Sequence, residues 1–187
     1  PTLASIKASQ QATGNWGNVM QLRPYQQDAV DSAIAWMRKS TEPALLGLST
    51  GAGKSHIAAA IALWITQKTG KKVLVLQPSK ELTSQNFEKY LATGEKASIF
   101  SASANSKCTK HDVVYATPKT VLNSISRFGD AFACVIVDEC HMTTPTIKQI
   151  IAHIAAKNPM LRVIGMTATP YRLGTGYIYQ YDATGER

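Results

Sequence analysis

The sequence lacks the features that mark membrane, secreted and disulfide-bonded proteins. Its 187 residues include three cysteines and no Cys-x-x-Cys pair, which favours free thiols in a reducing compartment such as the cytoplasm. The longest apolar run, residues 57–65, is much shorter than the roughly 20 residues that a membrane helix needs. No basic-then-apolar signal peptide opens the chain. We therefore expect a cytoplasmic protein that makes no contact with a membrane.

Acidic residues are also scarce. The chain has 12 Asp and Glu against 20 Lys and Arg, which gives a net charge of +8. A basic balance suits a polyanionic partner such as nucleic acid. The lysines are spread along the chain, however, so an ordinary soluble basic surface explains the charge equally well. Apolar residues make up 44 % of the chain, which predicts a globular domain with a proper core.

By contrast, the sequence is rich in short apolar runs that alternate with helical patterns. Residues 1–21 are polar and aperiodic, so we expect a flexible N-terminal arm followed by one domain over residues 22–187. The patterns predict strands at 44–49, 73–77, 97–100, 112–116, 133–138 and 161–166, and helices at 24–37, 54–68, 79–91, 118–127 and from Pro145, with Ser79 and Thr144 as caps. Continuous apolar strands between helices predict an α/β fold, with a mostly parallel central sheet and helices on both faces. Ligands of such sheets bind at the carboxyl ends of the strands.

One strand-to-helix connection has the composition of a phosphate-binding loop. Residues 48–55 read Leu-Ser-Thr-Gly-Ala-Gly-Lys-Ser. Gly51 and Gly53 let the backbone turn tightly and aim its N–H groups inward, and the helix beginning near Lys54 adds the positive end of its dipole. Lys54 can reach the β- and γ-phosphates, and the Ser55 hydroxyl can ligate Mg²⁺. Leucine at position 48 departs from the general G-x-x-x-x-G-K-[ST] pattern, and a glycine turn that only caps a helix is the alternative.

A second cluster stands where another apolar strand stops. Residues 135–142 read V-I-V-D-E-C-H-M and bring together Asp138, Glu139, Cys140 and His141. These residue types suit a zinc site, a cysteine–histidine nucleophile pair, or a site in which the cysteine is incidental. Beside a phosphate loop, the two acids suit a nucleoside triphosphatase, with Asp138 holding Mg²⁺ and Glu139 orienting and deprotonating the attacking water. A solvated acidic turn is the alternative without chemistry.

The other thiol and imidazole groups give weaker indications. Cys108 and His111 have the C-x-x-H spacing of two zinc ligands, but no second pair is evident. Cys134 lies within an apolar run and is expected in the core. Residues 177–181 carry tyrosines at alternate positions, which suit base stacking or an edge strand.

Taken in order, these segments and four others resemble the first RecA-like domain of a superfamily 2 helicase of the D-E-x-H type. The matching segments are 23–26 (RPYQ, Q motif), 48–55 (phosphate loop), 77–82 (QPSKEL, motif Ia), 116–119 (ATPK, motif Ib), 138–141 (DECH, motif II) and 166–170 (MTATP, motif III). The resemblance runs from about residue 22 to residue 180. At finer grain, residues 137–141 and 158–180 are similar to the RadD group of DNA-repair helicase-like proteins.

This resemblance implies a RecA-like P-loop NTPase fold, with the motif III strand between the phosphate-loop and motif II strands. It implies ATP and Mg²⁺ as cofactors, and recognition of the adenine edge by Gln26. The functional residues carried over are, for nucleotide binding, Arg23, Gln26, Thr50, Gly51, Ala52, Gly53, Lys54 and Ser55; for catalysis, Lys54, Asp138, Glu139 and His141; for Mg²⁺, Ser55 and Asp138; for nucleic acid, Pro78, Ser79, Lys80, Thr117, Pro118 and Lys119; and for coupling of the two sites, Thr167 and Thr169.

The leading hypothesis is therefore the ATP-binding domain of a helicase or translocase that acts on nucleic acid, on DNA in preference to RNA, in repair or remodelling. The alternatives are a nucleotide- and nucleic-acid-binding module without turnover, and the motor subunit of a type I or III restriction system. A GTPase or small-molecule kinase is disfavoured because no NKxD motif occurs. The family's second RecA-like domain, with arginine fingers worth about 10³–10⁵ in rate, has no counterpart in these residues. We therefore expect the isolated domain to bind ATP with little or no hydrolysis.

Overall fold

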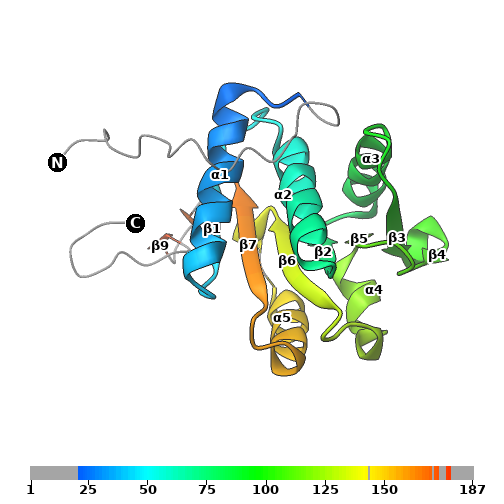
Figure 1. Ribbon diagram of the computed structural model, residues 1–187. Helices are drawn as coiled ribbons and strands as arrows, with labels where there is room; N and C mark the ends of the chain where they lie inside the picture. Colours follow the sequence, from blue (N-terminus) through cyan, green and yellow to red (C-terminus); the bar gives the residue numbers. More distant parts are fainter. Residues whose placement is uncertain (1–20, 143, 170, 173–175, 178–187) are drawn as a thin grey trace.

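The computed structural model describes residues 21–142, 144–169, 171–172 and 176–177 (Figure 1). Nearly all of the expected N-terminal arm and most of the tyrosine-bearing segment 177–181 lie outside these residues. None of the helices in the described ranges is long and apolar enough to cross a membrane.

Seven strands of the described chain form one sheet in the order β1-β7-β6-β2-β5-β3-β4, and each neighbouring pair is parallel except β3 with β4. Their bounds are β1 Ala44–Gly47, β2 Lys72–Leu76, β3 Ala97–Ser101, β4 Ser106–Lys107, β5 Val113–Ala116, β6 Phe132–Asp138 and β7 Arg162–Thr167. Two further short strands, β8 Tyr171–Arg172 and β9 Gly176–Tyr177, pair with each other. The motif III strand β7 lies between β1 and β6, as the resemblance implied.

Helices cover both faces of this sheet (Figure 1). Val73 and Val75 of β2 face one apolar cluster, with α1, α2 and α3, whereas Leu74 and Leu76 face the other, with α4 and α5. Burial on both sides explains why the central strands have unbroken apolar runs. The α/β prediction is therefore confirmed. The helix bounds are α1 Pro24–Lys39, α2 Lys54–Thr69, α3 Lys80–Leu91, α4 Pro118–Leu122 and α5 Pro145–Lys157, with 3₁₀ turns η2 Ala102–Ala104, η3 Ile125–Arg127 and η4 Cys140–Met142.

The local capping predictions are confirmed. The Ser79 hydroxyl accepts a hydrogen bond from the Leu82 N–H at 3.2 Å, at the start of α3. The Thr144 hydroxyl accepts one from the Ile147 N–H at 3.5 Å, at the start of α5. Both satisfy backbone donors that the first helical turn leaves without a partner.

The predicted helix over residues 118–127 is wrong in its second half. The α-helix ends at Leu122, and a separate 3₁₀ turn follows. The chain changes direction there, so that Phe128 can pack between the rings of Phe100 and Phe132, with ring centroids at 5.1 and 5.3 Å. The two-residue strand β4 is an additional element that the apolar pattern did not predict.

The apolar positions of the first helix predict that Tyr25, with Val30, Ile34 and Met37, lies on its buried face, and this prediction needs a correction. Tyr25 is 43 % exposed, and Gln26 beside it is buried in the helix face that packs inward. The reason lies in the loop that α1 meets, because both side chains donate hydrogen bonds to the carbonyl oxygen of Ala52.

Candidate functional site

The carboxyl ends of five parallel strands set out the candidate residues in a fixed order. The strands lie as β1-β7-β6-β2-β5. The segments that follow them along this edge are therefore the phosphate loop, Thr167, Asp138, Gln77 and Thr117. The carboxyl end of the sheet thus carries the predicted phosphate, acid and nucleic-acid segments side by side. Ligands of parallel sheets bind at this end.

The phosphate loop is a tight turn that ends at an open helix N-terminus. Gly51 and Gly53 have φ values of +80° and +76°, in the left-handed region that favours glycine. No side chain caps the start of α2 within the described residues. The Leu48 N–H donates to Thr167 O at 2.8 Å, which fixes the loop to β7. The backbone N–H groups at this helix start therefore suit a bound anion such as a phosphate.

Gln26 lies directly against this loop. Its Nε2 donates to Ala52 O at 2.8 Å, and its Oε1 accepts from the Arg23 N–H at 2.9 Å. The Tyr25 hydroxyl donates to the same Ala52 oxygen at 3.2 Å. A Cβ on Gly53 would lie 2.3 Å from Gln26 Nε2, so glycine is required there for this close approach. Both ends of the Gln26 amide are thus used within the protein, and adenine recognition would require at least one of these bonds to exchange.

An ion pair joins the phosphate loop to the acidic end of β6. Lys54 Nζ contacts Glu139 Oε1, and both side chains are largely shielded from solvent. Glu139 has a φ of +48°, which non-glycine residues rarely adopt, and its N–H donates to Asp138 Oδ1 at 3.0 Å. Unusual backbone conformations of this kind cluster at functional sites.

Asp138 is a buried carboxylate, 8 % exposed. Burial raises the pKa of its carboxyl above the ordinary value, and Glu139 adds to this, whereas the charge of Lys54 and hydrogen bonds from the Glu139 N–H and the Gln77 side chain lower it. With the Ser55 hydroxyl, on the first turn of α2, it would supply an all-oxygen donor set. Mg²⁺ prefers such a set and keeps several of its waters, so these residues fit a magnesium ion.

His141 connects Glu139 to the end of β7. Its Nδ1 lies 3.3 Å from Glu139 Oε2 and 2.7 Å from Thr167 Oγ1. Thr167 Oγ1 in turn accepts from the Thr169 N–H at 3.0 Å. The catalytic and coupling residues of the sequence analysis therefore form one chain of polar contacts.

Cys140 points away from this chain of contacts. It is buried, and its Sγ would lie 2.8 Å from a Cβ added to Gly165 in β7, so the thiol fills the space that this glycine leaves. Burial raises the pKa of the thiol to about 12. Its burial and its raised pKa favour a packing role for the cysteine, which is the third of the possibilities left open for residues 138–141. In the described part of the chain, no group of three or more His, Cys, Asp or Glu is placed to hold a metal ion.

The two predicted nucleic-acid segments are neighbours. Residues 77–80 and 117–119 follow β2 and β5, which are paired with Leu76 opposite Ala116. Each segment leads into a helix, α3 or α4. Two helix starts at one sheet edge suit contacts to a phosphate backbone.

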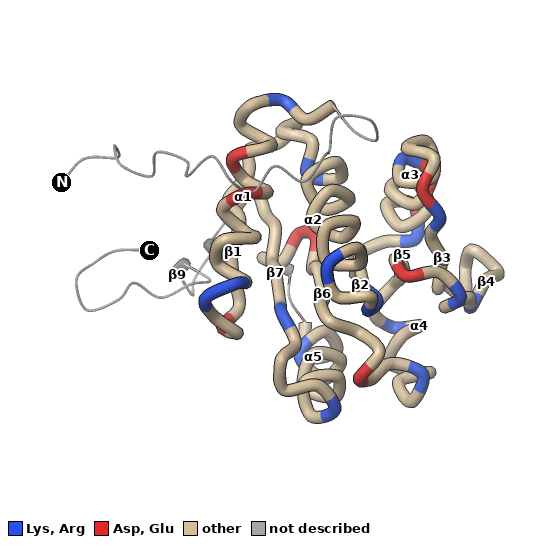
Figure 2. The backbone as a smooth tube through the Cα atoms, viewed as in Figure 1, with Lys and Arg blue, Asp and Glu red and all other residues tan. Residues whose placement is uncertain are grey.

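The side chains of these segments divide into structural and accessible groups. The Thr117 hydroxyl shares a hydrogen bond with Thr120 Oγ1 at 2.9 Å, and Pro118 opens α4. Lys80 and Lys119 are exposed, and the pair of Lys80 Nζ with Glu81 Oε1 is long, at 3.9 Å, so both lysines can reach a polyanion. Lys and Arg elsewhere are spread over several elements (Figure 2), and the net charge therefore does not single out one face.

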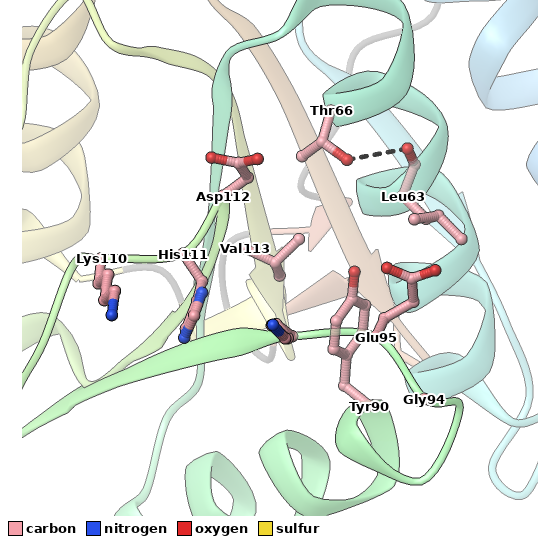
Figure 3. Close-up of a pocket in the computed structure, with 10 residues that line it drawn as sticks. Leu63, Thr66, Tyr90, Gly94, Glu95, Lys110, His111, Asp112 and Val113 are labelled. Atoms are coloured by element: carbon pink, nitrogen blue, oxygen red, sulfur yellow. Dashed lines mark hydrogen bonds between the residues drawn. The ribbon is translucent and has the colours of Figure 1, made fainter.

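A separate hollow of about 360 Å³ lies at the amino ends of the strands, opposite the candidate site (Figure 3). Tyr90 and residues 94–96 and 110–113 contribute to its lining, at the amino ends of β3 and β5. The lining contains none of the predicted site residues and mixes both signs of charge. It is therefore distinct from the candidate site at the carboxyl edge.

Sequence reasoning missed two residues at this edge. Tyr25 lies in the Q-motif segment and Gln77 opens the motif Ia segment, but neither was predicted as a site residue. The available signal was their position inside the Q motif and motif Ia. The contacts themselves join residues far apart in the chain, which periodicity does not report.

Comparisons with known proteins agree with this arrangement. A family model described as Type III restriction enzyme, res subunit, matches residues 19–172. Similar curated proteins include the ATP-dependent DNA helicase fml1 of Schizosaccharomyces pombe, 26 % identical over 81 % of this chain and 19 % of the relative. The ATP-dependent DNA helicase uvsW of Enterobacteria phage T4 is 27 % identical over 84 % of this chain and 31 % of the relative. A candidate ATP-dependent RNA helicase of Methanocaldococcus jannaschii is 31 % identical over 81 % of this chain and 20 % of the relative.

Solved structures share the fold. The UvsW helicase from bacteriophage T4 has a TM-score of 0.68 at 24 % identity, over 81 % of this chain and 54 % of that chain. The Pyrococcus furiosus Hef helicase domain has a TM-score of 0.65 at 25 % identity, over 80 % of this chain and 33 % of that chain. The chain spans about a fifth of the length of fml1 and of the M. jannaschii relative. The finer similarity to the RadD group stays a prediction. The chain belongs to the family of the Type III restriction enzyme res subunit, and its fold and motifs are those of a first RecA-like domain of the superfamily 2 helicases.

Proposed function

We propose that this domain binds ATP with Mg²⁺ on the phosphate loop and, within a helicase or translocase, uses ATP hydrolysis to move along nucleic acid. The observation that carries the proposal is the Lys54–Glu139 ion pair, because it joins a loop suited to phosphates to an acid suited to activate water. Both parts are needed for phosphoryl transfer to water.

Lys54 and Glu139 would change partners when ATP binds. The phosphates would attract Lys54 Nζ away from Glu139. The freed carboxylate would then orient and deprotonate the attacking water. Mg²⁺, when bound, neutralises phosphate charge, and Ser55 and Asp138 would hold it. His141 and Thr167 would report the state of Glu139 to the motif III segment, through the contacts of 3.3 and 2.7 Å.

The loop backbone over Thr50, Gly51, Ala52 and Gly53 would hold the phosphates, and the segment from Arg23 to Gln26 would hold the base. Gln26 would read the adenine edge by exchanging its bonds to Ala52 O and the Arg23 N–H. Base recognition and loop position would then be linked, because the same amide serves both.

Nucleic acid would run along the segments at residues 78–80 and 117–119. Lys80 and Lys119 are the exposed cations there, so binding should tolerate sequence and weaken with salt. Relatives named as DNA helicases favour DNA as the polymer, and a repair or remodelling role follows from that preference. A second RecA-like domain would supply arginine fingers. All three cysteines are free, which suits the cytoplasm.

A single-turnover assay tests this function against a module that binds without turnover. The 187-residue chain, in excess over γ-labelled ATP with Mg²⁺ and single-stranded DNA, is followed for hours so that slow hydrolysis is detected. Glu139→Gln should bind ATP at least as tightly as the wild type. Its rate of phosphate release should be lower by a factor of about 10² or more. Glu88→Gln, an exposed acid on α3, is the matched control.

The outcomes separate the two candidates. Phosphate release by the wild type above the rate of ATP alone, matched by Glu139→Gln, would exclude Glu139 as the group that activates water. Failure of the wild type to bind ATP at all would overturn both candidates. Binding of RNA in place of DNA would change the polymer and leave the ATP site as proposed.

A further inference from the structure

Gln77 is a buried polar residue that the proposed function does not use. It follows Leu76 at the carboxyl end of β2 and is 1 % exposed. Its backbone N–H donates to Ala116 O at 3.0 Å, which holds it to β5. On the other side, β2 pairs with β6, with Leu76 opposite Val137. This register places Gln77 beside Asp138.

The two ends of the Gln77 amide have different surroundings. The side chain hydrogen-bonds to the Asp138 carboxylate. An ionised carboxylate only accepts hydrogen bonds, so the NH₂ group of Gln77 must face it. The Oε1 is left buried, without a hydrogen-bond partner among the described residues. Buried acceptors in native proteins are almost always paired, so an orphaned one indicates a water, ion or ligand group that completes the site.

The position of Gln77 restricts what the partner of its Oε1 can be. Gln77 follows β2, between β6, which carries the proposed magnesium ligand, and β5, which leads to the proposed nucleic-acid segment. Because Gln77 is almost fully enclosed, a base or a long side chain cannot approach it easily, and a small donor is required. Mg²⁺ held by one or two protein oxygens keeps several waters, and each of these waters is a small hydrogen-bond donor.

We propose that Gln77 is a positioning residue of the magnesium site: its NH₂ group orients the Asp138 carboxylate, and its Oε1 accepts a hydrogen bond from a water molecule bound to Mg²⁺. This inference rests on the proposed function, since the ion is the one that accompanies ATP. Groups that hold metal ligands in place commonly change metal affinity by about 10–100-fold when they are removed. Gln77 thus acts on Mg²⁺ affinity and not on ATP directly.

The test measures ATP affinity of the 187-residue chain by calorimetry, over a Mg²⁺ titration and in EDTA. Gln77→Leu keeps a similar volume and removes both hydrogen-bonding ends. It should raise the Mg²⁺ concentration needed for half-maximal tightening of ATP binding by about 10-fold or more. Affinity in EDTA should equal that of the wild type. The matched control is Gln85→Leu, on the exposed side of α3, which should leave both values unchanged.

A second variant separates a metal role from a folding role. Gln77→Asn keeps both hydrogen-bonding ends of the amide on a shorter side chain, so its Mg²⁺ requirement should lie between those of Gln77→Leu and the wild type. Thermal melts check that each variant is folded, and Gln77→Met replaces Gln77→Leu if the branched side chain does not fit.

Three results would overturn the inference or its basis. An unchanged Mg²⁺ requirement in folded Gln77→Leu would show that the amide has no part in holding the ion. An equal loss of affinity with Mg²⁺ and in EDTA would show a merely structural role. A wild-type chain that binds ATP equally with and without Mg²⁺ would instead contradict the magnesium part of the proposed function, before any variant is considered.

Discussion

Gly53→Ala should be much more destabilising than Gly51→Ala, although the two glycines belong to the same loop and have nearly the same φ, +76° and +80°. The added methyl at Gly53 would lie 2.3 Å from Gln26 Nε2, whereas a methyl at Gly51 would meet nothing within 4 Å. The backbone cost is therefore common to both variants, and only Gly53→Ala must displace Gln26.

The magnitudes follow from those contacts. A left-handed conformation costs a non-glycine residue about 1–2 kcal/mol, which applies to both variants. Displacing Gln26 breaks its bonds to Ala52 O, at 2.8 Å, and to the Arg23 N–H, at 2.9 Å. Each is worth roughly 0.5–1.5 kcal/mol, so Gly53→Ala should lose about 1–3 kcal/mol more than Gly51→Ala.

Urea titration of the wild type, Gly51→Ala and Gly53→Ala, each with and without Gln26→Ala, measures this difference. In a Gln26→Ala background the methyl meets no amide, so Gly53→Ala should cost no more than Gly51→Ala, with a coupling energy of about 1–3 kcal/mol. Equal stabilities of Gly51→Ala and Gly53→Ala in the wild-type background would refute the contact. A difference that persists without Gln26 would refute its assignment to that side chain.

Three further changes probe the acidic strand end and the thiols. Asp138→Asn should raise the free energy of unfolding at pH 7, because burial raises the pKa of Asp138 and penalises the ionised acid in the folded state. This gain should vanish below about pH 4, where the carboxyl is protonated in both the folded and the unfolded state. Thr167→Val should lower the free energy of unfolding by about 0.5–1.5 kcal/mol, because the 2.7 Å hydrogen bond with His141 is lost. Iodoacetamide should label Cys108 first, since a side-chain hydrogen bond lowers the pKa of its thiol, whereas burial raises the pKa of Cys140 to about 12.

Each of these expectations has a direct contradiction. A drop in stability of Asp138→Asn at pH 7, measured by urea titration, would mean that the carboxylate is paired well enough to stabilise the fold. Additive losses in a Thr167→Val and His141→Ala cycle would mean that the two side chains do not interact. Mass spectrometry that finds Cys140 modified as fast as Cys108 in the folded chain would show that the thiol is accessible.

The alternation of strands and helices is predictable because it depends on local pattern. Strands buried on both faces produce unbroken apolar runs, and β2 and β6 therefore match their expected ranges to within a residue. The caps at Ser79 and Thr144 are predictable for the same reason, since a capping hydroxyl acts within its own first turn.

Features that depend on distant partners could not be predicted in this way. The end of α4 at Leu122 follows from the packing of Phe128 against Phe100 and Phe132, which belong to other elements. The two-residue strand β4 is too short to have a period.

The site shows the same division. The residue types of the phosphate loop and the acidic strand end predict their chemistry from sequence alone. The ion pair of Lys54 with Glu139 joins residues 85 positions apart, and the bond of Gln26 to Ala52 joins residues 26 apart. The sheet order decides both, and with them the enclosure of Gln77 beside Asp138.

Equilibrium binding of ATP to the 187-residue chain with Mg²⁺, compared between wild type, Lys54→Ala and Lys68→Ala, tests the central claim most directly. Lys68 is an exposed lysine at the other end of the same helix α2, so it controls for the loss of one charge. The account predicts binding by the wild type and by Lys68→Ala with equal affinity, and binding by Lys54→Ala that is weaker by about 10–100-fold, the value of a hydrogen bond to a charged group. No binding by the wild type, or equal binding by all three, would contradict it.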